Sequence, residues 1–409
     1  MNRAFLWSAA GSALSIALYA LFMAGVGVGT GSDAYFAGLG IAQALAGLLF
    51  APYEAFAQRF ALDRLRAGAR PAPPLVASYL ALSAVALIPY YLWGEALLGP
   101  LFGPAYAADP ALWRHHFRVL GALVPLAGAV AMIQVCCQAR ERYVLPKVGI
   151  VVSRIVAIGL LVAAGESRLR AMSVVVVAAQ ALAAGVGAAG VGGWGMRPRA
   201  LWGETRAALG EWLGVNRWTM ILKTDQLLER VLAARVATGF LSLFYMGWSG
   251  VVSLVEAFHA AFVVADSNRY HAAAHGARVG GLRALLDGPY RSSRAAGARL
   301  TGLAAGLTAA VAVAAVATGW APGGVRPAEV ALLLGTLVAA QLAQFLWKQL
   351  AGAYTIQHRA VEFARGLTLV YLVFVIPRIL LTWQLGAVGF CAGLVAYYGT
   401  QVLVVGRRA

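Results

Sequence analysis

Twelve long apolar segments run through this chain of 409 residues and constrain it to a membrane. Each is about 20 residues long or longer, the length that a helix needs to cross a bilayer. With 61% hydrophobic residues, 12% charged residues and a mean hydropathy of +0.74, a soluble globular protein is excluded. We therefore expect an all-α polytopic membrane protein. Its expected spans are residues 4–28, 34–57, 75–97, 117–138, 146–165, 171–194, 213–235, 239–264, 297–320, 328–350, 364–383 and 386–405.

The basic residues are concentrated in alternate loops, which predicts the orientation of the chain. With the N-terminus placed in the cytoplasm, 23 of the 33 Lys and Arg residues fall on that side. The opposite side receives five, which are Arg114, Arg118, Arg168, Arg170 and Arg326. This bias predicts that both termini lie in the cytoplasm. It also accounts for the net charge of +17 without a nucleic-acid partner.

The chain divides into two halves with six expected spans each. We expect an N-terminal lobe of residues 1–194, a cytoplasmic amphipathic linker of residues 195–212 and a C-terminal lobe of residues 213–409, around a central cavity. A faint repeat supports the division: Val28-Gly29-Thr30-Gly31 with Phe36 matches Val236-Ala237-Thr238-Gly239 with Phe244. Gln138 and Tyr143 match Gln349 and Tyr354 at nearly the same offset. These matches predict a duplicated six-helix unit.

The seventh expected span, with the residues around it from Asn216 to Gly239, is crowded with charge. It carries Arg217, Lys223, Asp225, Glu229, Arg230 and Arg235. At about 100° per residue, one polar stripe follows this helix, formed by Asn216, Thr219, Lys223, Gln226 and Arg230, while Asp225 and Glu229 form a separate acidic edge. Charges inside a membrane are costly, so we expect this helix to line an aqueous cavity. The alternative is that its charges form structural ion pairs with neighbouring helices.

Further polar side chains lie on other spans. On the eighth span, Ser242, Tyr245, Ser249, Ser253 and Glu256 share one face. On the second span, Gln43 and Glu54 share a face. Arg378 lies near the end of the eleventh span, where it either snorkels to the membrane surface or takes part in function.

These residue types favour transport of an anion. Arg presents a planar fork of donors to phosphate, and carboxylates within a membrane suit coupling to Na⁺ or H⁺. Cys136, Cys137 and Cys391 have no spacing typical of a metal site or a disulfide framework, so they are interpreted as packing residues. We expect no cofactor and no metal centre.

Three stretches resemble the lipid II flippase family (MurJ/MviN-like) of the multidrug/oligosaccharidyl-lipid/polysaccharide exporter superfamily. Leu222 to Val251 is similar to the passage between the seventh and eighth helices of that family, with Asp225, Gly239 and Phe244-Tyr245 as the matching features. Gly31 to Phe60 resembles its second helix, which opens at Asp33 and has a basic exit at Arg59. Gln138 to Ile155 resembles the turn between its fourth and fifth helices.

The resemblance implies alternating access and flipping of an undecaprenyl-phosphate-linked glycan across the bacterial inner membrane. We also expect a monomer whose partners are this substrate and the membrane lipids. Members that act on lipid II usually have fourteen helices and several arginines at the first helix, whereas this chain has twelve expected spans and only Arg3 there. A related polysaccharide precursor is therefore an equally suitable substrate. The candidate substrate-binding residues are Lys223, Arg230, Gln226, Tyr245, Glu54 and Arg59, and the candidate ion-coupling residues are Asp225, Glu229 and Glu256.

Two other functions remain open. One is a cation-coupled multidrug exporter of the same superfamily, in which the acidic residues bind the substrate or the ion. The other is a membrane-embedded glycosyltransferase or ligase, for which the external loop offers Asp109, Arg114, His115 and His116. The chain has no phosphate-binding glycine loop, HExxH motif or CxxC pair, so we expect a transporter rather than an enzyme.

Overall fold

The computed structural model describes residues 3–140, 142, 144–191, 194–215, 221–222, 224–263, 266, 269–270, 281–357 and 359–407. Every regular element in these residues is helical, which confirms the all-α prediction. The first part of the chain forms α1 (Arg3–Val26), α2 (Thr30–Arg66), α3 (Ala72–Phe102), α4 (Pro104–Ala108), α5 (Pro110–Leu120), α6 (Leu123–Ala139), α7 (Val144–Ala163), α8 (Arg168–Val191) and α9 (Pro198–Val215). The rest forms α11 (Asp225–Val236), α12 (Phe240–Phe258), α14 (Leu282–Asp287), α15 (Arg291–Thr318), α16 (Pro327–Ile356), α17 (Ala360–Leu385) and α18 (Ala387–Gly406).

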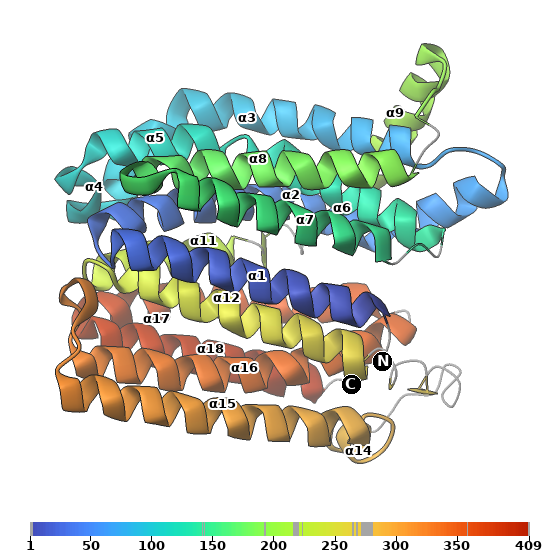
Figure 1. Cartoon of the computed structure of the whole chain (residues 1–409). Helices are drawn as coiled ribbons and strands as arrows, with labels where there is room; N and C mark the ends of the chain where they lie inside the picture. The colour runs from blue at the N-terminus through green and yellow to red at the C-terminus, as the bar shows by residue number, and fades with distance from the viewer. Residues whose placement is uncertain are drawn as a thin grey trace. The chain divides into compact units, whose positions relative to one another are not determined.

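The chain forms two compact units, Met1–Val231 and Leu232–Ala409. In each unit the long helices run alongside one another (Figure 1). The expected linker is largely helical, because α9 covers most of it and packs on α2 and α3. Arg64 on α2 forms an ion pair of 2.6 Å with Glu204 on α9. The proposed lobe limits of 1–194 and 213–409 remain a prediction.

In the first unit, α6 is the central helix. It packs on α2, α3 and α8, while α7 pairs with α8 and α1 lies mainly on α7. The fully buried Tyr79 of α3 fixes this centre by donating its hydroxyl towards Ala46 O at 3.3 Å and Val124 O at 3.1 Å. Gly128 of α6 leaves the space that the ring fills. A single aromatic side chain therefore ties α2, α3 and the start of α6 together.

The second unit repeats these helix pairs. Its central helix α16 packs on α12, α15 and α18, and α17 pairs with α18. The corresponding pairs of the first unit are α6 with α2, α3 and α8, and α7 with α8. The turn from α1 to α2 and the turn from α11 to α12 each contain three residues. The packing therefore agrees with the duplicated unit predicted from the sequence.

Ten described helical segments are long and apolar enough to cross a membrane. They correspond to the expected spans other than the seventh and eighth, so the protein is a multi-pass membrane protein. The eighth expected span is also helical, because α12 continues into a π-helical turn at His259–Val263. The last two spans are separate helices, α17 and α18, joined at Gly386, whose φ of 54° favours glycine.

The seventh expected span is described in part. Residues 221–222 are helical, and α11 begins at Asp225 and has 12 residues, or about 18 Å. A turn at Thr224 precedes it, where the Thr224 amide donates to Ile221 O at 3.1 Å. Residues 216–220 and Lys223 lie outside the described residues, so one continuous seventh span stays a prediction.

Candidate functional site

The best-defined candidate residue is Arg230, which lies in α11 within the first unit. Its side chain is only 7% exposed. One terminal nitrogen, Nη1, donates to Gln226 O at 2.8 Å, and the other, Nη2, donates to Gln43 Oε1 on α2 at 3.3 Å. The aliphatic part of the side chain crosses α2 at Gly40, where a Cβ atom would overlap it. Arg230 is therefore held against one turn of α2 by contacts on both sides.

Next to this arginine lies an apolar groove of about 350 Å³. The groove is formed by α2, α3, α5 and the start of α11, and is lined by Ile41, Ala44, Leu45, Leu48, Ala86, Pro89, Tyr90, Trp93, Gly94, Leu97, Leu101, Phe117, Thr224 and Leu227. The hydroxyl of Tyr90 donates to Phe117 O at 2.7 Å, so this polar atom is already satisfied. The groove therefore suits a hydrocarbon chain better than a polar molecule.

Arg230 and the groove are adjacent on both helices. Leu227, which lines the groove, precedes Arg230 by three residues on α11, so the two side chains are neighbours on the helix surface. On α2, Ile41 and Ala44 line the groove, and they lie directly beside Gly40 and Gln43, which contact Arg230. The cationic side chain of Arg230 therefore lies beside the apolar groove.

The acidic residues of α11 lie on another side of that helix. Asp225 is 7% exposed and Glu229 is 2% exposed. Each is two residues from Leu227, and at about 100° per residue this places both roughly opposite the groove. The predicted separation between a basic-polar stripe and an acidic edge is thus present in α11. Both carboxyl groups are buried, as a coupling residue would be.

Most of the other candidate residues lie wholly or partly outside the described part of the chain. Lys223 lies outside the described residues. Glu54 and Arg59 belong to α2, and Glu256 belongs to α12, but their side chains lie outside the described part. Tyr245 is buried in α12 of the second unit, with 5% of its surface exposed. The structure thus brings Arg230 and Gln226 together, and it adds Gln43, which was noted in the sequence only as a polar residue of the second span.

Arg378 does not snorkel to the membrane surface. It is 2% exposed, and its guanidinium carbon lies 4.6 Å from the centre of the Tyr397 ring in the second unit. Gly393 of α18 provides room for its side chain. The Tyr397 hydroxyl accepts a hydrogen bond from Gln401 Nε2 at 2.6 Å. Arg378 therefore belongs to the interior contact between α17 and α18.

The residues considered for an enzyme have structural partners. Asp109 caps α5, because its Oδ1 accepts a hydrogen bond from the Leu112 amide at 3.0 Å. His115 Nε2 lies 3.2 Å from Arg170 O. His116 is fully buried, with its ring 5.6 Å from that of Tyr35. The expected external loop is instead mostly the helices α4 and α5, in which Asp109 and Arg114 are exposed, His115 is half-buried and His116 is buried.

No protein-family model matches the chain, and no curated protein matches it. Solved structures do. The lipid II flippase MurJ in an inward closed conformation aligns with 98% of this chain and 86% of its own, at 11% identity and a TM-score of 0.67. An inward-facing multidrug resistance MATE family transporter of the MOP superfamily aligns with 100% of this chain and 94% of its own, at 13% identity and a TM-score of 0.60. The eukaryotic MATE transporter AtDTX14 aligns with 99% of this chain and 92% of its own, at 14% identity and a TM-score of 0.54.

These likenesses extend over nearly the whole chain, while the sequence identities are low. They agree with the two repeated helical units and with the membrane spans described above. The resemblance stated from the sequence is therefore confirmed at the level of the fold. The protein has the fold of the lipid II flippase MurJ and of the MATE transporters of the MOP superfamily.

Proposed function

We propose that the protein is a flippase that moves an undecaprenyl-phosphate-linked glycan across the bacterial inner membrane by alternating access. The observation that carries this proposal is the position of the buried Arg230 beside an apolar groove. A polyprenyl phosphate has the same two parts, an anionic group attached to a long hydrocarbon chain. The guanidinium would bind the phosphate, and the groove would hold the part of the chain next to it.

The physical argument favours a lipid-linked anion over a soluble one. A phosphate bound by Arg230 gains a charge-assisted hydrogen bond, which is strong where water is excluded. A hydrocarbon chain that enters the groove leaves the equally apolar membrane, so the groove contributes packing contacts and position rather than hydrophobic free energy. A soluble phosphorylated sugar would gain only the first contribution. The fold of a lipid II flippase agrees with this proposal, and the fold of MATE transporters agrees with the alternative.

The alternative is a cation-coupled exporter of multiple drugs, and the buried carboxyl groups of Asp225 and Glu229 favour it. In the flippase proposal these two residues, with Glu256, couple transport to Na⁺ or H⁺, and Lys223, Gln226, Tyr245, Glu54 and Arg59 complete the contacts with the substrate. We also propose a monomer with both termini in the cytoplasm, and no cofactor. Resistance of a drug-sensitive strain that expresses the protein separates the two functions: the flippase proposal expects none.

Filling the groove tests the proposal directly. Ala86→Trp places a large ring where the hydrocarbon chain is expected, so it should slow flipping of a long-chain substrate by about tenfold, which corresponds to about 1.4 kcal/mol of lost packing contacts. Flipping is measured in proteoliposomes with a fluorescent polyprenyl-diphosphate-linked glycan. The matched control is Ala84→Trp, an exposed position on the same helix that does not line the groove. Equal rates for the two variants would refute the role of the groove.

Gly40→Ala should weaken the site without unfolding the protein. The added methyl group overlaps the side chain of Arg230, which must turn away from Gln43. Because a flexible side chain can move, we expect flipping to fall by about fivefold to tenfold, with the unfolding temperature changed little. Gly159→Ala on α7 has open space at the same atom and serves as the control. A fall in flipping that both variants share would exclude the specific contact with Arg230.

A further inference from the structure

A second site, away from Arg230, lies entirely within the second unit. A cavity of about 610 Å³ is formed where α14 and the start of α15 meet the end of α18. It is lined by three arginines, Arg283, Arg294 and Arg407, and by one carboxylate, Asp287. Leu282, Leu286 and Leu403 provide its apolar surface. The cavity therefore combines a basic rim with an apolar wall.

The charges in this cavity do not balance. Asp287 pairs with Arg294 and lies 3.7 Å from Arg283, so two cations share one carboxylate. In the part of the chain that the structure describes, Arg407 has no carboxylate partner. Three cations and one anion leave an excess of two positive charges. Such a cavity favours an anionic ligand, and arginine forks suit phosphate.

The backbone shapes the cavity through two glycines. A Cβ atom on Gly406 would lie 3.0 Å from Leu282 Cβ, and one on Gly281 would lie 3.7 Å from Gly406 O. Gly281 also has a φ of 98°, a conformation that other residues rarely adopt. Gly281 and the start of α14 can therefore approach the end of α18 closely. This approach places Arg283 and Arg407 around the same space.

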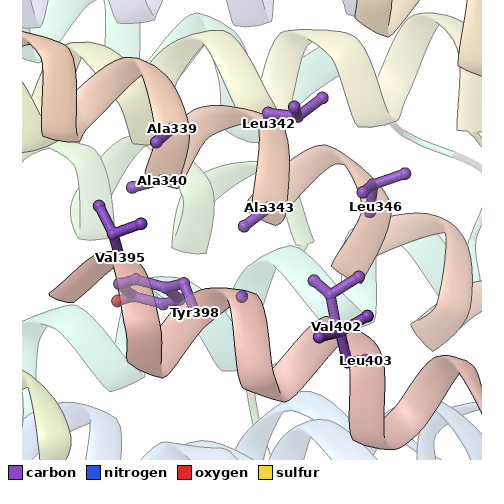
Figure 2. Close-up of a pocket in the computed structure, with 10 residues that line it drawn as sticks. Ala339, Ala340, Leu342, Ala343, Leu346, Val395, Tyr398, Val402 and Leu403 are labelled. Atoms are coloured by element: carbon purple, nitrogen blue, oxygen red, sulfur yellow. The ribbon is translucent and has the colours of Figure 1, made fainter. Parts of the chain in front are cut away.

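An apolar groove of about 270 Å³ meets this cavity at Leu403. It runs between α16 and α18, and Figure 2 shows Ala340, Ala343 and Leu346 of α16 opposite Tyr398, Val402 and Leu403 of α18. From Val395 to Leu403 the groove follows α18 for about 12 Å along the membrane span. Leu403 is 59% exposed and lines both spaces.

We propose that these two spaces form one binding site for an anionic glycerophospholipid of the surrounding membrane. The phosphate of the headgroup lies between Arg283 and Arg407, and one acyl chain lies in the groove between α16 and α18. The cavity lies at the end of the apolar span of α18, which is where a headgroup meets its chain. Under the proposed topology this end faces the cytoplasm, where basic pockets between helices bind anionic lipid headgroups.

The test measures thermal unfolding of the full chain in detergent with added short-chain phosphatidylglycerol. We expect a concentration-dependent rise in the unfolding temperature, and no rise with short-chain phosphatidylcholine at equal concentration. Glycerol phosphate supplies the same phosphate without a chain. If it protects as well as phosphatidylglycerol, the ligand is a soluble phosphate and the lipid proposal is wrong.

Two sets of variants locate the binding. Arg283→Gln with Arg407→Gln removes the headgroup contacts and should weaken phosphatidylglycerol binding by about tenfold. Gly399→Phe fills the groove at a position with open space, and should weaken phosphatidylglycerol binding without disturbing the fold. The matched controls, Arg291→Gln and Gly302→Phe, change the same residue types at exposed positions outside both spaces. Unchanged binding in both test variants, or equal losses in the controls, would overturn the site.

Discussion

Arg230→Ala is expected to lower the rate of flipping of a polyprenyl-diphosphate-linked glycan by about 10- to 100-fold. The guanidinium is buried against α2 beside the apolar groove. The other arginine of α11, Arg235, is exposed instead of buried. A hydrogen bond to a charged group contributes about 1.5–3 kcal/mol, which corresponds to this range of rates. The rate is measured in proteoliposomes as loss of fluorescence accessible to an external quencher.

Two further variants separate charge from geometry. Arg230→Lys keeps the positive charge but loses the planar fork, so we expect an intermediate rate. Arg235→Ala removes an exposed arginine from the same helix and should leave the rate within twofold of the wild type, the scale of an exposed charge. If Arg230→Ala flips the substrate as fast as Arg235→Ala in folded protein, Arg230 does not bind the substrate.

The largest expected effect on stability is at Gly389. This residue lies three positions after Gly386, in the tight connection between α17 and α18, and an added Cβ atom would overlap the carbonyl of Leu381. Backbone cannot turn away as a side chain can, so the two helices must separate. We expect Gly389→Ala to cost about 2–3 kcal/mol and to lower the unfolding temperature by roughly 3–4 °C in a chain of this length.

The control for this prediction is Gly335→Ala in α16, a glycine of the same unit with open space at the Cβ position. Alanine is a better helix former than glycine, so this change should leave the unfolding temperature unchanged or raise it slightly. The comparison uses thermal unfolding of both purified variants under the same conditions. An unfolding temperature for Gly389→Ala within 1 or 2 °C of the wild type, roughly the scale of a surface substitution, would contradict the expected clash.

The membrane spans could be predicted because each depends on local composition. About 20 apolar residues in succession specify a spanning helix wherever they lie in the chain. The repeat was also visible in part, since Val28 to Gly31 and Val236 to Gly239 mark equivalent turns before α2 and α12. The seventh span stays a prediction, because part of it lies outside the described residues.

The site could be predicted only one helix at a time. Periodicity separates Arg230 and Gln226 from Asp225 and Glu229, because these residues are close in sequence. The contact of Arg230 with Gly40 and Gln43 joins residues nearly 190 positions apart, and no pattern in either segment indicates it. The apolar groove is likewise a space between four helices, so it depends on their packing rather than on any one of their sequences.

The most direct test of whether the protein flips a lipid-linked anion compares two substrates that differ in the group joining the glycan to the lipid. Wild-type protein in proteoliposomes is given a fluorescent glycan on a polyprenyl diphosphate, and the same glycan on an uncharged polyprenyl ether. We expect rapid flipping of the diphosphate, slow flipping of the ether, and no uptake of a cationic dye such as ethidium. Equal rates for the two lipids, or ethidium uptake without diphosphate flipping, would contradict it.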